Sequence, residues 1–269
     1  MPSFDKEYFN MGYLDTLSYK DTFVHRLDPR IKLIVILSFI ITVVSFNKYE
    51  VLSLAPFFIL PVLFISLGDI PAGFIFKKIL IVSPFAFFIG IFNPLLDSGV
   101  MHEVFGIGIS GGWISFFSIM IKFVLTISAA LLLIATTSFP GVCNALLKLK
   151  APEIFVSQLL FLYRYIFVLM EETMKIIRAR DMRSFDKKGK EIKVFINLIS
   201  VLFIRTIERS EKIYQAMLSR GFQGRIDTVK IHRLSATDII FALVSFVLLY
   251  FLRRYDVVIM IGNLFNGYL

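Results

Sequence analysis

The chain has 269 residues, of which 57% are hydrophobic, and its mean hydropathy is +0.77. Composition therefore excludes an ordinary soluble domain and indicates a polytopic membrane protein. The formal net charge of +9 fits basic cytoplasmic loops better than nucleic-acid binding, and the single cysteine, Cys143, excludes an internal disulfide or a multi-cysteine metal site.

The N-terminal third predicts a polar arm and two membrane spans. The first thirty residues are polar and contain no leading apolar segment, so we expect no cleavable signal peptide. The first span is expected at about 31–46, where Lys32 can snorkel from the helix start. The second is expected at about 51–67, with Pro56 and Pro61 inside it.

Three further apolar runs predict the remaining spans. They cover about 79–92, 113–139 and 236–252, and the loop 93–112 between the first two carries no Lys or Arg. Arg253 and Arg254 follow the last run, and a short apolar tail continues to residue 269, so the sequence leaves five spans and six spans open.

Basic residues sort to one side of the expected membrane. The N-terminal arm, the loop 68–78 and the stretch 148–233 are rich in Lys and Arg. Lys48 is a minor exception on the other side, and Arg253 and Arg254 disagree with the pattern if the chain emerges there after the last run. The positive-inside rule therefore places the N-terminus and the long basic stretch in the cytoplasm.

The stretch 140–225 predicts two long helices with arginine-rich ends. A short helix at about 140–150 precedes patterns over 154–183 and 194–220, each apolar at its start and amphipathic later. Each would be about 40 Å long at ~1.5 Å per residue. Their apolar stripes have no partner within the chain, which indicates docking to a second protein, and a nearby arginine suits a carboxylate or helix-end carbonyls there.

The spans contain little chemistry of their own. Lys122 and Arg164 are the ionisable exceptions. Structural pairing or snorkelling is expected for Lys122, and an architectural role for Arg164, which would pair with Glu171 or Glu172 or with backbone carbonyls. The scattered histidines are not expected to bind metal. They are His25, His102 and His232. The chain also lacks a phosphate-binding loop for ATP.

Several motifs in order resemble one transporter family. They are HRLDPRIKL (25–33), GIFNP (90–94), ATTSFP (135–140), LYRYIFVLMEE (162–172) and SRGFQG (219–224). Together they resemble the transmembrane (T) components of energy-coupling factor (ECF) ABC transporters, in particular the cobalt/nickel CbiQ-type proteins, over about residues 18–224.

This resemblance implies a fold and a set of partners. The fold is an all-α membrane protein with about five to six transmembrane helices plus long cytoplasmic coupling helices ending in arginine motifs. Two ABC ATPases bind those helices and carry ATP and Mg, while a separate S component holds the metal ion and a small accessory membrane protein joins some complexes. The T component itself is a non-catalytic scaffold, with no cofactor and no nucleic acid bound, in a prokaryotic plasma (inner) membrane.

The family also carries two short Ala-Arg-Gly-like motifs at the coupling-helix tips, one for each ATPase. Here the resemblance places the first on Ala179, Arg180 and Asp181, and the second on Ser219, Arg220 and Gly221. Asp181 replaces the usual glycine, which removes the close approach that glycine allows. Arg178 and Arg183 are secondary candidates for the same role.

The expected organisation has three parts: 1–139 with the arm and first four spans, 140–225 with the coupling helices, and 226–269 with the last span and tail. ATP-driven closure of the ATPases is expected to move Arg180 and Arg220. The apolar surfaces at 154–169 and 194–204 are then expected to reorient the S component.

The substrate is expected to be cobalt, with nickel as the second candidate, and the alternative is a T component for another micronutrient such as a vitamin. Three rival classes fit the sequence less well. A self-sufficient secondary transporter needs mid-membrane polar groups and repeats, a membrane enzyme needs a catalytic constellation, and a nucleic-acid binder needs aromatic residues in the basic stretch.

Overall fold

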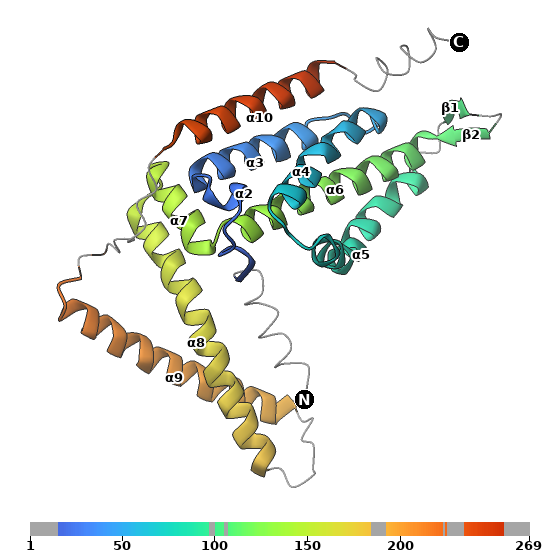
Figure 1. The fold of residues 1–269 in the computed structure, drawn as a ribbon. Coiled ribbons are helices and arrows are strands. Elements are labelled where there is room, and N and C mark those ends of the chain that lie inside the picture. Colours follow the sequence, from blue (N-terminus) through green and yellow to red (C-terminus); the bar gives the residue numbers. More distant parts are fainter. Residues whose placement is uncertain are drawn as a thin grey trace. The chain divides into compact units, whose positions relative to one another are not determined.

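The computed structural model describes residues 16–96, 100–104, 107–183, 192–222, 224 and 234–255. These residues form two compact units along the chain (Figure 1). Unit 1 holds the described residues between Phe139 and Ile231, and unit 2 holds those in Leu14–Ser138 and from His232 onward.

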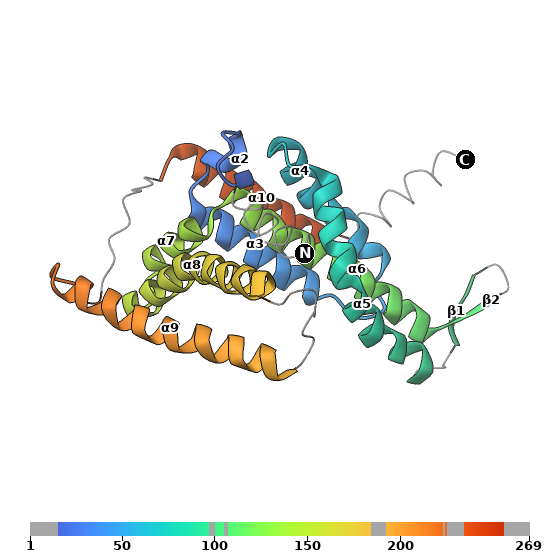
Figure 2. The same cartoon turned by 90° about the horizontal axis from the view of Figure 1, so that it is seen from below.

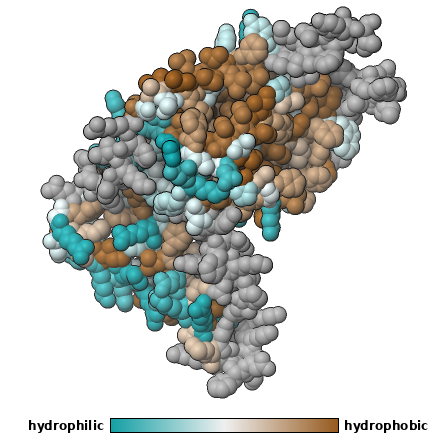
Figure 3. All heavy atoms as spheres, viewed as in Figure 1, coloured by the Kyte–Doolittle hydropathy of each residue, from teal (hydrophilic) through white to brown (hydrophobic). Residues whose placement is uncertain are grey.

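Unit 2 is built around three packed helices, α3 (Pro29–Val44), α6 (Gly111–Thr136) and α10 (Ala236–Arg254). Their facing sides form an apolar core that includes Ile36 and Phe39 of α3, Leu125 and Leu132 of α6, and Leu249 of α10. The outward sides are apolar too, and brown side chains cover much of the visible face of this unit (Figure 3). A helix that is apolar all round suits a lipid environment.

Polar groups join the three helices at the N-terminal end of α3. Asp28 caps α3 by accepting from the Arg30 backbone N–H (2.8 Å), and Pro29 occupies the first helical position. The Asp238 carboxylate of α10 accepts from the Asp28 N–H (2.9 Å), and the buried Lys32 donates to the Thr136 carbonyl oxygen at the end of α6 (2.7 Å). These bonds satisfy helix-end groups that water does not reach.

A second set of polar contacts joins the same helices at the C-terminal end of α3. Lys122 of α6 donates to the Phe46 carbonyl oxygen (2.6 Å), and Arg253 of α10 donates to the Ser45 carbonyl oxygen (3.3 Å). The start of α10 lies beside the start of α3, and the end of α10 lies beside the end of α3, so these two helices run in the same direction. Helix α6 runs antiparallel to them, because its end lies beside the start of α3 and its Lys122 lies beside the end of α3.

The remaining elements complete unit 2. A short α2 (Phe23–Arg26) precedes α3, and the expected second span is a 3₁₀ helix, η1 (Leu52–Phe58), that continues as α4 (Ile59–Leu67). The 3₁₀ form fits a segment interrupted by Pro56. Helix α5 (Ala72–Leu96) packs along α6 and is longer than expected from sequence, so Lys77 and Lys78 lie within it and not in a preceding loop.

A β-hairpin connects α5 to α6. Strands β1 (Val100–Val104) and β2 (Ile107–Ser110) pair antiparallel, where the sequence predicted only a loop. The fold is otherwise helical across the described residues, which confirms an all-α membrane protein with this small addition.

Within the described residues, four helices are long and apolar enough to cross a membrane: α5, α6, α8 and α10. A shorter apolar segment covers Leu52–Leu67, and α3 has 16 residues but matches α10 from end to end. The end of α6 and the start of α10 both lie beside the start of α3. The segment between α6 and α10 therefore begins and ends on the same side of the membrane. An isolated crossing by α8 would contradict this arrangement, whereas a crossing by both α8 and α9 would not. Unit 2 by itself offers five apolar segments for spans: α3, η1 with α4, α5, α6 and α10.

Unit 1 consists of α7 (Phe139–Lys148), α8 (Glu153–Arg183) and α9 (Ile192–Leu218). The Phe139 ring stacks on the Tyr163 ring with centroids 4.7 Å apart, which joins α7 to α8. Cys143 is buried in α7, and burial raises the pKa of its thiol to about 11. The three-part organisation of the chain stays a prediction.

Candidate coupling site

The two long helices of unit 1 run antiparallel. Phe161 near the start of α8 meets Phe222 just beyond the end of α9, with ring centroids 5.9 Å apart. Further along, Glu172 of α8 pairs with Arg205 of α9 at 3.1 Å. Two contacts in this order fix the antiparallel direction, and the helices lie next to each other in Figures 1 and 2.

The antiparallel pairing separates the two predicted arginine motifs. Arg180 lies near the C-terminal end of α8, whereas Arg220 follows α9 and lies at the level of Phe161, near the beginning of α8. From Phe161 to Arg180, α8 rises on the order of 30 Å at ~1.5 Å per residue. The sequence placed both motifs at helix tips, and the structure places those tips at opposite ends of one helix pair.

The second motif forms a Schellman cap. The Gly221 N–H donates to the Leu218 carbonyl oxygen (2.9 Å) and the Phe222 N–H donates to the Met217 carbonyl oxygen (3.0 Å). Gly221 has φ = +79°, a left-handed conformation that glycine adopts at little cost. The cap therefore ends α9 sharply at Arg220, whose side chain is exposed together with that of Ser219.

The first motif has a different backbone conformation. Ala179, Arg180 and Asp181 all lie within α8, which continues to Arg183. A residue inside a helix does not need a left-handed conformation, so the departure from glycine at position 181 has a local explanation. The Arg178 side chain is exposed and the Arg180 side chain is half-buried.

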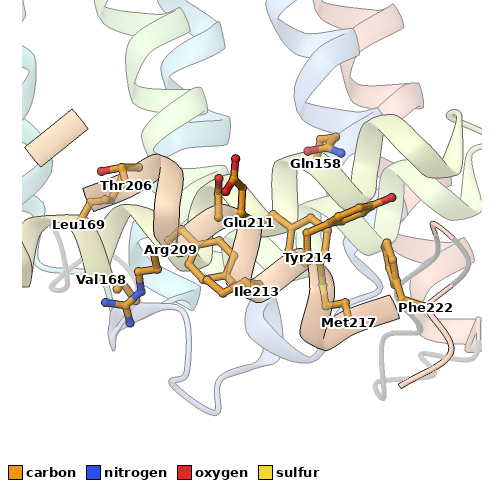
Figure 4. A pocket seen from close by; sticks show the side chains of 13 residues that line it. Gln158, Val168, Leu169, Thr206, Arg209, Glu211, Ile213, Tyr214, Met217 and Phe222 are labelled. Carbon is orange, nitrogen blue, oxygen red and sulfur yellow. The ribbon is translucent and has the colours of Figure 1, made fainter. Parts of the chain in front are cut away.

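A cavity of about 480 Å³ lies between α8 and α9 (Figure 4). Its walls are mostly aromatic and aliphatic, with Phe161 and Tyr165 from α8, Tyr214 and Met217 from α9, and Phe222 from the cap. Two cap residues therefore also line the cavity, so its packing and the position of Arg220 are linked. A volume in this range is typical of pockets that accept a ligand or a partner side chain.

A smaller, charged recess of about 250 Å³ adjoins this cavity. The two share four wall residues, and the recess adds charged groups from α9, with Glu172 opposite them. The shared residues are Val168, Leu169, Thr206 and Arg209. The interhelical space thus changes from apolar at the Arg220 end to charged toward the middle of the pair.

The acidic residues of α8 have partners other than the one expected from sequence. Glu171 pairs with Lys175 one turn away (2.9 Å), and Glu172 pairs with Arg205 across the helix pair. The prediction that either would pair with Arg164 is therefore wrong, and the Arg164 side chain is exposed.

Large apolar side chains remain exposed along both helices. On α8 they include Ile154, Phe155 and Leu162, and on α9 they include Ile196 and Phe203, each at least half exposed. They fall within the segments 154–169 and 194–204 that the sequence marked as a partner surface. Exposed apolar area of this extent is typical of an interaction surface or of contact with lipid.

Of the histidines, the structure describes the surroundings of His25 alone. Its Nε2 faces the carbonyl oxygens of Leu17 (3.0 Å) and Ala135 (3.3 Å), and its Nδ1 lies 2.7 Å from the Thr22 hydroxyl. Nε2 therefore carries the proton, and burial lowers the pKa of His25 below its usual value. His102 lies in β1, and His232 lies outside the described residues. No group of three or more metal-ligating side chains occurs among the residues that were described.

Two features of this site were missed by reasoning from sequence. The interhelical cavity depends on how α8 and α9 cross, which periodicity does not specify. Phe222 had a partial signal in the sequence, since a hydrophobic residue directly after a capping glycine commonly packs back on its own helix, but that signal did not indicate the contact with Phe161 of α8.

The fold and site define a class: a multi-pass helical membrane protein with two arginine-tipped helices crossed in an antiparallel pair. The family model described as CbiQ, cobalt transport protein, matches residues 20–232. The chain belongs to this family and is a T component of an energy-coupling factor transporter.

Curated relatives agree with the family assignment. The chain is 32% identical over 254 residues to the energy-coupling factor transporter transmembrane protein EcfT of Bacillus subtilis, covering 86% of this chain and 94% of the relative. It is 30% identical over 231 residues to EcfT of Streptococcus thermophilus, covering 80% and 86%, and 30% identical over 224 residues to EcfT of Listeria innocua, covering 76% and 82%. As a T component the chain is a transporter subunit, and such transporters include ATPase and S-component partners.

Proposed function

We propose that the chain couples two ABC ATPases to a substrate-binding S component through α8 and α9. The observation that supports this proposal is the position of Arg180 and Arg220 at opposite ends of one antiparallel helix pair. Tips separated by roughly 30 Å along α8 suit two separate ATPase sockets better than one shared socket. Arg178 and Arg183 are then secondary contacts at the first tip.

Each arginine has a chemical role at its tip. A guanidinium presents a rigid fork of donors to a carboxylate or to helix-end carbonyl oxygens of the partner ATPase. The Schellman cap holds Arg220 at an abrupt helix end, whereas Arg180 projects from a continuing helix. In this proposal ATP and Mg²⁺ bind the ATPases, and this chain contributes no catalytic group.

The helices then act as levers. Closing of the ATPases on ATP displaces the two tips, and the helix pair transmits that displacement because Glu172–Arg205 and Phe161–Phe222 hold its members together. The exposed apolar side chains at 154–169 and 194–204 are the proposed contact with the S component, which reorients in the bilayer and releases substrate inward.

For the substrate we propose a transition-metal cation, with cobalt first and nickel second. The family description, cobalt transport protein, supports this choice. The alternative is a T component for another micronutrient such as a vitamin, which is favoured by the EcfT relatives, whose names specify no metal. A small accessory membrane protein is a further proposed partner.

We place the chain in the plasma membrane of a prokaryote with its N-terminus in the cytoplasm. Support comes from the basic residues of the N-terminal arm and of 148–233, which the positive-inside rule assigns to the cytoplasm. In the five-span arrangement both of these regions lie on the same side.

An uptake assay with intact partners tests the coupling role. Arg220→Ala should abolish ATP-driven uptake while the S component still binds its substrate, because the tip is lost and the rest of the fold is kept. Lys175→Ala is the matched control, since Lys175 is an exposed cation whose ion pair stays within α8. Normal uptake by the Arg220 variant would refute the proposed role.

A further inference from the structure

The chain passes from unit 2 to unit 1 through a break between two helices. Helix α6 ends at Thr136 and α7 begins at Phe139, and the division between the units falls after Ser138. Pro140 lies in the first turn of α7 and has no N–H, so it cannot donate to the Thr136 carbonyl oxygen four residues before it. The last carbonyl oxygens of α6 therefore need donors from elsewhere in the protein.

Two side chains from the N-terminal part of the chain supply these donors. The Lys32 ammonium of α3 donates to the Thr136 carbonyl oxygen (2.7 Å), and the His25 Nε2–H of α2 donates to the Ala135 carbonyl oxygen (3.3 Å). The two acceptors are consecutive, whereas their donors lie 104 and 110 residues away in the sequence. The end of α6 is thus clamped to α2 and α3 inside unit 2, directly before the chain enters unit 1.

Lys32 is a costly donor for a purely structural role. Its side chain is 1% exposed, so the sequence-based expectation that it snorkels to water is wrong. Burial of an ammonium group is unfavourable, and apolar side chains of similar volume often give a fold that is equally stable or more so. The carboxylates of Asp28 and Asp238 offset part of this cost, since both act electrostatically on Lys32. The presence of a lysine here therefore points to conformational specificity, with one fixed position for the end of α6.

Lys122 offers an internal comparison, because it makes the same kind of bond between the same two helices. It donates from α6 to the Phe46 carbonyl oxygen just after α3 (2.6 Å). This acceptor lies at the opposite end of α3 from Lys32, away from the break between α6 and α7. Both lysines join α3 to α6, but the bond of Lys32, and not that of Lys122, fixes the point at which the chain leaves unit 2.

We propose that Lys32, supported by His25, is a positioning residue for transport. It holds the end of α6 so that a displacement of α8 and α9 starts from a fixed root and acts on the S component, instead of being absorbed by movement at the break. The proposal rests on the proposed coupling function and adds a pair of residues to it. Both residues act through α6 and not on an ATPase or on the substrate.

Spin labels on the two units test the proposal in the complex with the ATPases. One label is placed at Lys77→Cys of α5 and the other at Gln215→Cys of α9, both at exposed positions. The distance distribution between them is measured with and without a non-hydrolysable ATP analogue for wild type, Lys32→Met and the matched control Lys122→Met. Methionine has a similar length but no N–H donor, so each variant loses one lysine-to-carbonyl bond. Unfolding midpoints, subunit stoichiometry and ATP hydrolysis are measured alongside.

We expect the ATP analogue to shift a narrow distance distribution in wild type and in Lys122→Met. In Lys32→Met the distribution should broaden and the shift should be lost, while both ATPases remain bound and hydrolyse ATP. Uptake of Co²⁺ per ATP hydrolysed, with Ni²⁺ as the second probe, should fall about fivefold or more in this variant. Lys32→Arg, which keeps the charge and the donors, should restore the shift.

His25→Leu extends the test to the second donor. His25 is half-buried, so this variant should fold even if Lys32→Met does not, and it should broaden the distribution by a smaller amount. Equal broadening in Lys32→Met and Lys122→Met, or an unchanged shift in either donor variant, would overturn the proposal. Failure of the coupling function itself would appear in wild type, as a complex without ATPases or without any shift.

Discussion

Gly221 and Asp181 occupy the third position of the two arginine motifs but have different backbone conformations. Gly221 has φ = +79° and nothing lies within 4 Å of where a Cβ would be, so a side chain there is opposed by backbone conformation and not by a clash. Asp181 is helical. The same substitution at the two sites should therefore have different effects.

Gly221→Ala should destabilise unit 1 by about 1–2 kcal/mol, the usual cost of a left-handed alanine, whereas Asp181→Ala should be neutral or slightly stabilising. Thermal unfolding midpoints in detergent measure the difference, with an expected drop of about 2–8 °C for the glycine variant alone. Gly221→Asn provides the control, since asparagine tolerates this conformation better. Equal effects at the two positions would show that the cap does not depend on glycine.

His25 joins the segment before α2 to the end of α6 through the Leu17 and Ala135 carbonyl oxygens. Its pKa is lowered, chiefly by burial, so the unfolded chain takes up a proton more readily than the folded one. The stability that neutral His25 contributes is thus present above its unfolded pKa of about 6.5 and is lost as the pH falls toward the lower folded value.

The wild-type unfolding midpoint should therefore decrease between pH 7.5 and pH 5.5 by more than that of His25→Gln. Glutamine keeps an N–H donor for the carbonyl oxygens but does not titrate. The difference between the two pH profiles isolates His25 from other titrating groups. Parallel profiles would contradict the assignment of a neutral, buried imidazole.

At the scale of elements, the pair of α8 and α9 depends on two contacts that differ in kind. The ion pair Glu172–Arg205 is partly exposed and is expected to contribute little, since exposed pairs typically give up to ~1 kcal/mol. The rings of Phe161 and Phe222 meet edge to face and also line the interhelical cavity. The aromatic contact should therefore hold the Arg220 tip more strongly.

A double-mutant cycle on Phe161→Leu and Phe222→Leu measures that contact. The expected coupling energy is about 0.5–1.5 kcal/mol, and the cycle Glu172→Gln with Arg205→Gln should give less. Unfolding midpoints of the four variants in each cycle provide the data. A larger coupling energy for the ion pair would show that Glu172–Arg205 holds the Arg220 tip more strongly than the aromatic contact does.

Sequence patterns predicted the helices of this protein better than their ends and contacts. Apolar runs and periodicity predicted α8, α9 and α10 with errors of no more than two residues at either end. The 3₁₀ form of η1, the extension of α5 through Lys77 and Lys78, and the β-hairpin depend on local backbone choices that hydropathy does not resolve. Which carbonyl Lys122 would meet depended on the register of α3 against α6, a tertiary property.

The candidate site was also predictable only in part, because its motifs can be read from the sequence but its tertiary contacts cannot. The order of motifs identified Arg180 and Arg220, and the glycine after Arg220 predicted the helix end. The separation of the two tips was not predictable, because the antiparallel direction of α8 and α9 is set by contacts between residues distant in sequence, such as Phe161 with Phe222. The roles of the motif residues stay predictions.

At the scale of the whole molecule, the shared direction of α3 and α10 determines which segments lie on one side of the membrane. With five spans, position 182 at the end of α8 and position 215 on α9 share a side, and positions 47 and 255 share the other. If α8 and α9 both crossed, position 182 would join positions 47 and 255.

Single cysteines at these positions test the arrangement with a membrane-impermeant thiol reagent in intact cells. Met182→Cys and Gln215→Cys should be protected, while Asn47→Cys and Tyr255→Cys should be labelled. Native Cys143 is buried with a thiol pKa of about 11, so it should give little background. Labelling of Met182→Cys from outside would contradict the five-span fold.

In the proposed coupling mechanism, two separated arginine tips recruit two ATPase subunits. The most direct measurement is co-purification of the tagged chain with its genomic neighbours, followed by the ATPase stoichiometry of the wild type, Arg180→Glu, Arg220→Glu and the double variant. We predict two ATPase subunits for the wild type, weaker retention when one tip is reversed, and none when both are, with the S component retained throughout. Unchanged recovery of both ATPases with the double variant would contradict the account.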